Sequence, residues 1–532
     1  MESIILFIMV ITLLFMGVPI AVALGLSSVL TIALFSSDSM SSVALQLFSA
    51  SQNYTLLAIP FFVLASTFMS TGGVARRIIR LAVASVGHFR GGLAMASVLA
   101  CMMFAALSGS SPATVVAIGT IAIAAMRQVG YSKEFSAGII ANAGTLGILI
   151  PPSIVMVVYA TATNVSVGRM FLAGILPGLV AGLMLMIAIY VVARRRNLPS
   201  EPWRGFGEVV SAGKDAGWGL FLIFIIIGGI YGGAFTPTEA ASVAAVYSVF
   251  VALFVYRDMG PLKGLAWIPE GSAAKTVVGF KASVYALAIF AVWMISSFFF
   301  LGGMDTTTRM QIGIALAVFV LGAYPYARQQ PNPLTFLSGL PVWGYNLGLI
   351  ARRFVPALFH GDTNKAMVDS AKTTVMLMFI IVNALLFAHT LTAERIPQTI
   401  TEWMLGAGFN WFTFLIAVNI LLLIGGQFME PSGLLLIVAP VVFPIAMELG
   451  IDPIHLGIIM VVNMEIGMVT PPIGLNLFVT SGITGMSLAQ VVKAALPFVV
   501  VLLIFLIIVT YVPALSTMVP YALMGPEIIL NR

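Results

Sequence analysis

Two short segments carry residues that suit the binding of a cation inside a membrane. The segment Ser108-Gly109-Ser110 offers hydroxyl groups, and its glycine permits backbone angles that bring carbonyl groups close to a bound ion. The pair Pro151-Pro152 interrupts a later apolar run, because proline removes a backbone donor and clashes with the preceding turn. Carbonyl groups freed at such a break need protein, water or an ion as a partner in hydrocarbon. Together these oxygens are suited to hold sodium without a carboxylate.

The proline pair occurs twice in matching surroundings. Pro471-Pro472 follows Gly467 at the spacing at which Pro151-Pro152 follows Gly147, and the two pairs lie 320 positions apart. Other landmarks keep the same offset: Gly130 with Gly450, and Pro177 with Pro497. Interrupted helices at corresponding positions of two halves indicate a transporter with internal repeats and a site near mid-membrane.

Composition places the whole chain in a membrane. It has 532 residues, of which 60% are hydrophobic and 8% charged, and its mean hydropathy is +1.09. A soluble domain would carry about 25% charged residues. Since one span needs ~20 apolar residues, there is room for roughly ten or more. The net charge of +6 comes from short basic segments between helices, which is typical of cytoplasmic loops and indicates no nucleic-acid partner.

Each half is expected to hold a helical hairpin followed by a broken crossing. The arms Leu93–Leu107 and Ala113–Met126 are too short to cross singly, because fifteen helical residues rise only ~22 Å against a core of ~30 Å. A re-entrant hairpin entering from the cytoplasm fits, and the alternative is a kinked pair of short spans. The corresponding crossing is 135–161. The second half repeats the plan with arms at 412–424 and 434–446 and a crossing at 456–480. An odd number of crossings between the halves would make the repeats inverted.

Seven sequence blocks are specific as a set, although each is weak alone. They are Ile59-Pro60-Phe61-Phe62, Gly87-His-Phe-Arg90-Gly91-Gly92, Ser108-Gly-Ser-Ser111-Pro-Ala-Thr114, Gly147-Ile-Leu-Ile-Pro-Pro152-Ser153, Pro177-Gly178, Phe235-Thr-Pro-Thr-Glu239-Ala and Thr470-Pro-Pro-Ile-Gly474-Leu-Asn476. In this order and spacing the sequence resembles the large membrane subunit of tripartite ATP-independent periplasmic (TRAP) transporters. The resemblance covers about 1–257 and 365–515, so the stretch 258–364 looks like an insertion relative to the usual pattern.

The resemblance implies both a fold and a function. The fold would be an all-α polytopic membrane protein with inverted repeats, two re-entrant hairpins and two broken helices, moving as an elevator. The function would be sodium-driven import of an organic acid anion across a bacterial inner membrane. A periplasmic substrate-binding protein would deliver the anion, and a small four-helix membrane subunit, expected as a separate polypeptide, would accompany the chain. Sodium would be the coupling ion, with no other cofactor.

Domain boundaries follow from the repeat and the resemblance. The expected segments are N-terminal scaffold helices (1–86), the first transport repeat (87–193), scaffold helices (194–257), an inserted segment with about two extra helices (258–364), a scaffold helix and connector (365–410), the second transport repeat (411–515) and a C-terminal tail (516–532). Within the insertion, helices are expected at 285–301 and 312–324. The polar, proline-rich stretch 328–362 is expected to form a cap, a loop or a flexible linker.

The resemblance also implies the residues of two sodium sites. The first would use the hydroxyl-bearing tip and main-chain oxygens at the break: Ser108, Ser110, Gly147, Ile150 and Pro152. The internal repeat places the second at Gly426, Met429, Gly467, Thr470 and Pro472, where the tip lacks serines. Tight helix packing is the alternative role for the glycines and serines of both tips.

The substrate anion needs hydrogen-bond donors and positive potential. Half-helix N-termini after the breaks, at Ser153 and Ile473, would supply the potential. Candidate donors are Asn142, Ser153, Asn463 and Asn476, each of which could equally be a polar contact between helices. Arg169 is expected to reach the membrane interface, with a substrate role as the lesser alternative. Glu465, beside the second break, could bind a cation or a polar neighbour.

The sequence contains no pattern typical of an enzyme. It has no phosphate-binding loop, no metal-spaced histidines or cysteines and no nucleophile elbow, so no catalytic residue is assigned. The single Cys101 excludes an intramolecular disulfide. Two other functions remain open: a stand-alone sodium/carboxylate symporter, which would need no binding protein, and an ion channel, which would need no moving domain.

Overall fold

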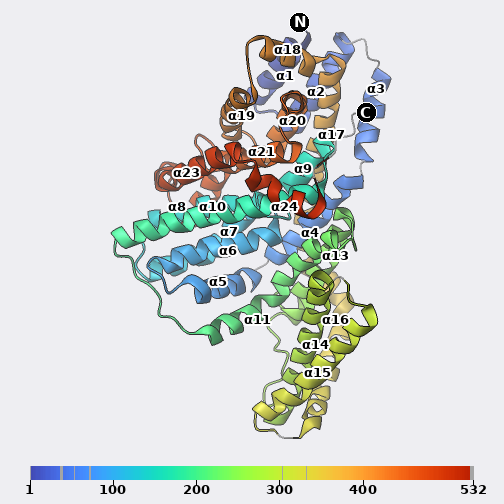
Figure 1. Ribbon diagram of the computed structural model, residues 1–532, viewed down its shortest axis with the longest axis vertical. Helices are drawn as coiled ribbons and strands as arrows, with labels where there is room; N and C mark the ends of the chain where they lie inside the picture. Colours follow the sequence, from blue (N-terminus) through green and yellow to red (C-terminus); the bar gives the residue numbers. More distant parts are fainter. Residues whose placement is uncertain are drawn as a thin grey trace. The chain divides into compact units, whose positions relative to one another are not determined.

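A computed structural model describes residues 2–35, 40–52, 54–70, 73–301, 303–330, 332–525 and 527. Every regular element in this part of the chain is helical (Figure 1). Among the described residues, nine helices are long and apolar enough to cross a membrane, or ten if one bent pair counts as a span. The all-helical membrane class is confirmed, whereas re-entry of the hairpins stays a prediction.

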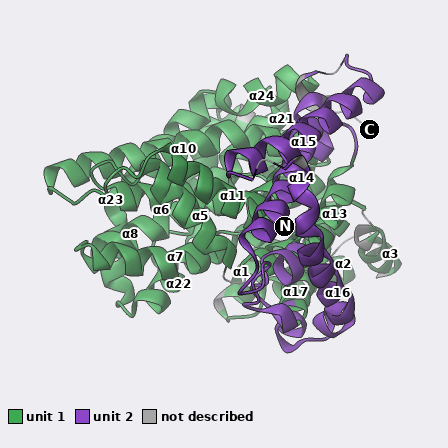
Figure 2. Cartoon of the chain, turned by 90° about the horizontal axis from the view of Figure 1, so that it is seen from below, with its two compact units in different colours: residues 1–227, 235–249, 367–532 green, residues 228–234, 250–366 purple. Residues whose placement is uncertain are grey.

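The chain forms two compact units (Figure 2). Unit 1 comprises Met1–Ile227, Phe235–Val249 and Met367–Arg532, and unit 2 comprises Gly228–Ala234 and Phe250–Ala366. Both repeats belong to unit 1. Its other helices are α1 (Glu2–Phe15), α2 (Ile20–Leu34), α3 (Met40–Ser51), α4 (Ala58–Ser70), α5 (Gly73–Val86), α11 (Phe206–Ile223) and α18 (Ile396–Gly406), with most of α13 (Pro237–Phe250) and α17 (Gly361–Ala393).

The first repeat consists of a helix pair and an interrupted helix. Its elements are α6 (Gly92–Ser108), α7 (Ser111–Gln128), α8 (Lys133–Ala143), a 3₁₀ segment η2 (Gly144–Ile148), α9 (Ile154–Thr163) and α10 (Val167–Arg195). Ser132, Ser153 and Ser166 begin α8, α9 and α10, because each serine hydroxyl accepts the backbone N–H three residues on. The predicted interruption therefore lies between η2 and α9.

The second repeat has the same order of α-helices, without a described counterpart of η2. They are α19 (Trp411–Gly426), α20 (Pro431–Glu448), α21 (Pro453–Gly467), α22 (Leu475–Thr484) and α23 (Leu488–Tyr511), and α24 (Ala514–Met524) follows them. Asn410 and Ser487 form capping boxes at α19 and α23, and the Asp452 carboxylate accepts the N–H groups of Ile454 and His455 at 2.9 Å. The second interruption lies between α21 and α22. Both Pro-Pro peptide bonds, Pro151-Pro152 and Pro471-Pro472, are cis.

The two repeats pack into each other. Helix α7 packs on α22, α8 packs on α22 and α23, and α10 packs on α21 and α23. Small residues allow these approaches: a Cβ added at Gly138 of α8 would lie 2.2 Å from the Ala494 carbonyl oxygen of α23. The repeats consequently share one interior rather than forming two separate bodies.

Unit 2 contains one helix more than the sequence predicted. It holds α12 (Gly229–Tyr231), π-helical η4 (Val251–Val255), η5 (Gly260–Leu262), α14 (Ala274–Phe300), α15 (Thr306–Ala327), η6 (Pro333–Gly339) and α16 (Leu340–Leu358). The stretch 328–362, expected to be a cap, a loop or a linker, contains α16, whose Pro341 lies in the first turn, where proline is tolerated. Buried Asn346 fixes this helix by accepting a 2.6 Å hydrogen bond from Arg257.

Candidate functional site

The first hairpin tip lies directly against the first helix break. Gly109 ends α6 with φ +59°, and a Cβ added to it would lie 2.6 Å from the Pro152 carbonyl oxygen. A Cβ added to Gly147 would lie 2.7 Å from the Ser110 carbonyl oxygen. Only glycine therefore fits on either side of this contact. The structure brings the tip residues together with Gly147 and Pro152, and the binding of sodium there stays a prediction.

Hydroxyl groups converge on the carbonyl of this tip. The Ser108 and Thr114 hydroxyls lie 2.9 Å apart, and they donate to the Ser110 carbonyl oxygen at 3.3 and 2.9 Å. Thr114 was not assigned a role from the sequence, although it lies in the same sequence block. The predicted contributor Ile150 turns its side chain toward Gly178 of α10, where a Cβ would lie 2.6 Å from Ile150 Cγ1. Its place in the site thus depends on its main chain alone.

The second tip meets the second break through two glycines. A Cβ added to Gly467 would lie 2.8 Å from three backbone atoms of Gly426, namely Cα, C and O. The Thr470 hydroxyl donates back to the Ile466 carbonyl at 2.7 Å, and the Met429 N–H donates to the Gly425 carbonyl at 3.1 Å. The second repeat therefore has the same contact between hairpin tip and helix break as the first, although the hydrogen bonds around it differ.

The two breaks differ in burial. Pro151 and Pro152 are buried, whereas Pro471 and Pro472 are exposed within this chain. Glu430 at the second tip begins α20, because its carboxylate accepts the Gly433 N–H at 3.1 Å and the Ser432 hydroxyl at 3.0 Å. The first break is the enclosed member of the pair, and the second opens to the surface.

The predicted substrate-binding asparagines are fully buried and bond to neighbouring helices. Asn142 donates to the Ala495 carbonyl at 3.2 Å, and Asn463 donates to the Asn419 side chain at 2.7 Å. Asn476 of α22 donates to the Ser111 hydroxyl at 2.7 Å and so ties the second break to the first hairpin. Within the described residues, the Oδ1 atoms of all three asparagines accept no hydrogen bond.

Ser153 and Ser111 have local roles at the first break. The Ser153 hydroxyl donates to the Ile148 carbonyl at 2.6 Å and accepts the Met156 N–H, so it closes the break and begins α9. The Ser111 hydroxyl donates to the Gly144 carbonyl at 2.9 Å. These bonds satisfy carbonyls that the interruption of the helix frees. Polar contact within and between helices, the alternative to substrate binding, thus accounts for the hydrogen bonds of the Ser153 hydroxyl. It also accounts for those that the amide nitrogens of Asn142, Asn463 and Asn476 donate.

Thr145 and Glu465 form a buried pair at corresponding positions of the two repeats. They are 320 residues apart, and the Thr145 hydroxyl donates to Glu465 Oε1 at 2.7 Å. Both side chains are 0% exposed, and Glu465 Oε2 has no hydrogen-bond partner in the described structure. Glu465 was singled out as an ionisable group, whereas Thr145 was missed, although the repeat offset links the two. A buried carboxyl with one unoccupied acceptor could take a proton or a cation.

Comparisons with known proteins cover almost the whole chain. The family described as "Tripartite ATP-independent periplasmic transporter, DctM component" matches residues 7–324 and 346–515. A protein of Vibrio cholerae named C4-dicarboxylate TRAP transporter large permease protein DctM is 58% identical over 525 residues, which are 98% of either chain. A protein of the same name in Pseudomonas aeruginosa is 52% identical over 498 residues, 94% of this chain and 93% of that one.

The matched ranges include part of the stretch 258–364, because the first continues to residue 324 and the second begins at 346. That this stretch is an insertion relative to the usual pattern stays a prediction. A solved structure of the YdaH transporter of Alcanivorax borkumensis covers 88% of this chain and 86% of its own, at 14% identity and a TM-score of 0.40. That similarity is too low to support an argument. Family membership and the apolar helices together make the chain a multi-pass membrane protein.

Replacing Gly467 by alanine is expected to force the second tip away from the break. The new Cβ meets backbone rather than a flexible side chain, so Gly467→Ala should cost about 1–3 kcal/mol of stability. Gly482→Ala in α22 is the matched control, because its Cβ enters open space and alanine is favoured in a helix by about 1 kcal/mol. Unfolding of both purified variants measures the difference. Equal stabilities would contradict the contact.

Proposed function

Because this chain belongs to the DctM component family of tripartite ATP-independent periplasmic transporters, we propose that it is the large membrane subunit of a C4-dicarboxylate importer. Relatives named for C4-dicarboxylates are 58%, 52% and 39% identical. Relatives named for isethionate, sialic acid or 2,3-diketo-L-gulonate are 35%, 28% and 30% identical. The gradient in identity favours a C4-dicarboxylate over these other organic anions.

Sodium is the proposed coupling ion. The observation that carries this proposal is the twofold contact of a hairpin tip with a broken helix, where glycines admit backbone oxygens to close range. The first site would use Ser108, Ser110, Gly147, Ile150 and Pro152, and the second Gly426, Met429, Gly467, Thr470 and Pro472. Neither set includes a carboxylate, and main-chain oxygens at helix ends suit a monovalent cation. The proposed substrate-binding residues remain Asn142, Ser153, Asn463 and Asn476, whose N–H and O–H groups would turn from their present partners to donate to the anion.

Transport would proceed by movement of the two repeats as one elevator body. Their mutual packing supports this, since α7 and α8 contact α22 and α8 contacts α23. The N-terminal helices would remain in the static frame. Helix α2 contacts the second hairpin at Gly433, where an added Cβ would lie 3.3 Å from Ile20 Cδ1. This contact would have to slide during each cycle.

The importer would act with two partners in a bacterial inner membrane. A small four-helix subunit is proposed because the match covers only 63% and 66% of the relatives named DctMQ and SiaT, which leaves room in them for a further segment. A periplasmic binding protein would deliver the anion. The relatives are named permeases, and no enzymatic activity is proposed.

Reconstitution tests the proposal as a whole. Vesicles that contain this chain and its small subunit should accumulate labelled succinate only with an inward sodium gradient and added binding protein. Uptake without the binding protein would instead support a stand-alone sodium/carboxylate symporter. Sodium-independent currents far above carrier turnover would support a channel. No succinate uptake under any of these conditions would contradict the proposed substrate class.

Replacing Ser110 by alanine should weaken the first sodium site. The variant keeps the main-chain carbonyl and loses one hydroxyl, and a hydrogen-bonding group near a charge contributes about 1.5 kcal/mol, so the sodium concentration for half-maximal uptake should rise about tenfold. The measurement is the sodium dependence of initial uptake rates. Ser242→Ala, at a half-buried serine of α13, is the matched control. An unchanged dependence in Ser110→Ala would count against this site.

Linking α2 to the second hairpin should stop an elevator. The pair Ile20→Cys and Gly433→Cys, placed in a Cys101→Ala background, lies at the contact between them. Crosslinking by a short thiol reagent should abolish succinate uptake, and reduction or reagent removal should restore it. Phe412→Cys with Tyr511→Cys, whose native rings are 4.7 Å apart within the second repeat, is the control pair. Full uptake after complete crosslinking at 20 and 433 would exclude this motion.

A further inference from the structure

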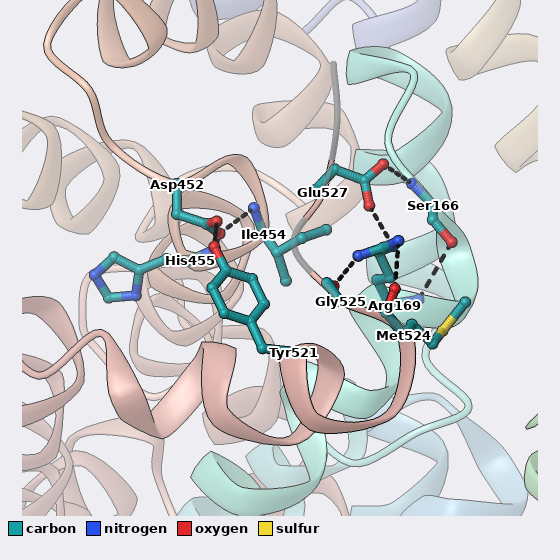
Figure 3. A network of polar contacts seen from close by, with 9 residues as sticks. All are labelled: Ser166, Arg169, Asp452, Ile454, His455, Tyr521, Met524, Gly525 and Glu527. Carbon is teal, nitrogen blue, oxygen red and sulfur yellow. Dashed lines mark hydrogen bonds and ion pairs between the residues drawn. The ribbon is translucent and has the colours of Figure 1, made fainter. Parts of the chain in front are cut away.

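Arg169 is held by the last described residues of the chain. It is the third residue of α10, and its guanidinium donates to the Gly525 carbonyl and, at 2.9 Å, to the Met524 carbonyl. Arg169 Nε forms an ion pair with Glu527 Oε2 at 2.9 Å. Figure 3 shows the guanidinium turned toward these three acceptors, which lie at the end of α24 and just after it. The expected role of Arg169 at the membrane interface does not account for this set of contacts.

The surroundings of Glu527 form a binding site for a carboxylate. Glu527 Oε1 accepts the backbone N–H of Ser166 at 3.2 Å, and Ser166 begins α10, a helix of 29 residues. The N-terminus of a helix carries a partial positive charge, so a cation in its first turn is unfavourable unless an anion lies beside it. Arg169 is such a cation. Both the helix end and the guanidinium therefore favour a carboxylate at this position.

This site faces the side from which a substrate would arrive. Helix α10 rises about 43 Å, enough to cross the ~30 Å apolar core, and it ends in Arg194, Arg195 and Arg196. Clustered arginines mark a cytoplasmic end. The opposite end, with Ser166 and Arg169, is consequently the periplasmic one.

The C-terminal strap, which we define as residues 514–525 and 527, is fastened at two further points. The Ser516 hydroxyl lies 2.6 Å from His455 Nδ1, and the Tyr521 hydroxyl donates to the Asp452 carboxylate. Figure 3 shows Asp452 and Tyr521 beside the start of α21. Ser516 is buried, whereas the side chains of Arg169 and Glu527 are 17% and 11% exposed. The end of the strap is therefore partly open to the surface, whereas Ser516 is not.

The repeat architecture does not itself require the strap. At the other end of the repeats, the position equivalent to its binding groove is a cavity of about 350 Å³ lined by Ser132, Phe135 and Val192, among others. Ser132 and Phe135 correspond by the 320-residue offset to Asp452 and His455, which the strap contacts. The family match also ends at residue 515, at the start of the strap.

We propose that Arg169 and the N-terminus of α10 form a periplasmic carboxylate-binding site for the incoming organic acid, and that Glu527 occupies this site until the substrate displaces it. The proposal rests on the proposed function for the class of substrate. One carboxylate of a C4-dicarboxylate takes the place of the Glu527 carboxylate on Arg169 and the Ser166 N–H. The strap then acts as an internal competitor, and its release exposes the start of α10 and α21.

Removing the charge of Glu527 should tighten succinate binding. Isothermal calorimetry on the full chain with its small subunit measures the affinity, and Glu527→Gln should bind succinate about 3–10-fold more tightly, because a neutral amide competes less well for a guanidinium. Glu402→Gln, at an exposed glutamate of α18, is the control and should bind as the wild type does. In an Arg169→Lys background the effect of Glu527→Gln should shrink, since lysine lacks the forked geometry.

Backbone hydrogen exchange tests displacement directly. Saturating succinate should accelerate exchange of the wild-type strap, including the Gly525 N–H that bonds to the Tyr521 carbonyl, and uncharged succinamide should not. Unchanged exchange with succinate, or equal or weaker binding by Glu527→Gln, would overturn the proposal. If the wild type still imports succinate in vesicles, that failure concerns the strap alone. If the wild type neither binds nor imports succinate, the proposed function fails with it.

Discussion

The interruption of two helices inside an apolar environment is the constraint on which the rest of this structure depends. Each interruption frees backbone carbonyls that hydrocarbon cannot satisfy, so each must meet other polar atoms. At the first break the hydroxyls of Ser111 and Ser153 take two of these carbonyls, those of Gly144 and Ile148. The tip of a helical hairpin covers the same break. A cluster of backbone oxygens in a buried position is the result, and it is the chemical basis for proposing an ion there.

Glycine makes this arrangement sterically possible. Gly109 and Gly147 lie on the two sides of the first contact, and Gly426 and Gly467 on the two sides of the second. A side chain at any of these positions would separate the tip from the break. Two buried hydrogen bonds near these contacts join one repeat to the other, one from Asn476 to Ser111 and one from Thr145 to Glu465.

The two ends of the repeats are built differently, despite their common plan. One end leaves a cavity beside the start of α8, whereas the C-terminal strap fills the equivalent position beside the start of α21. The buried and exposed proline breaks add a second asymmetry. The strap and the unequal breaks therefore make the two ends of the repeats chemically different.

The sequence by itself determined the class, the repeat and the breaks. The apolar length of the chain predicts a membrane protein, and the two proline pairs predict where helices are interrupted. The offset of 320 relates Gly147 to Gly467, because the repeat can be read from the order of residues alone. The sequence failed where packing decides. Helix α16 forms in a proline-rich stretch, where Pro341 lies in its tolerated first turn and Asn346 accepts a hydrogen bond from Arg257, although Pro356 lies inside the helix. The partners of Asn142, Thr145 and Arg169 lie 353, 320 and more than 350 residues away, and only the tertiary structure brings such residues together.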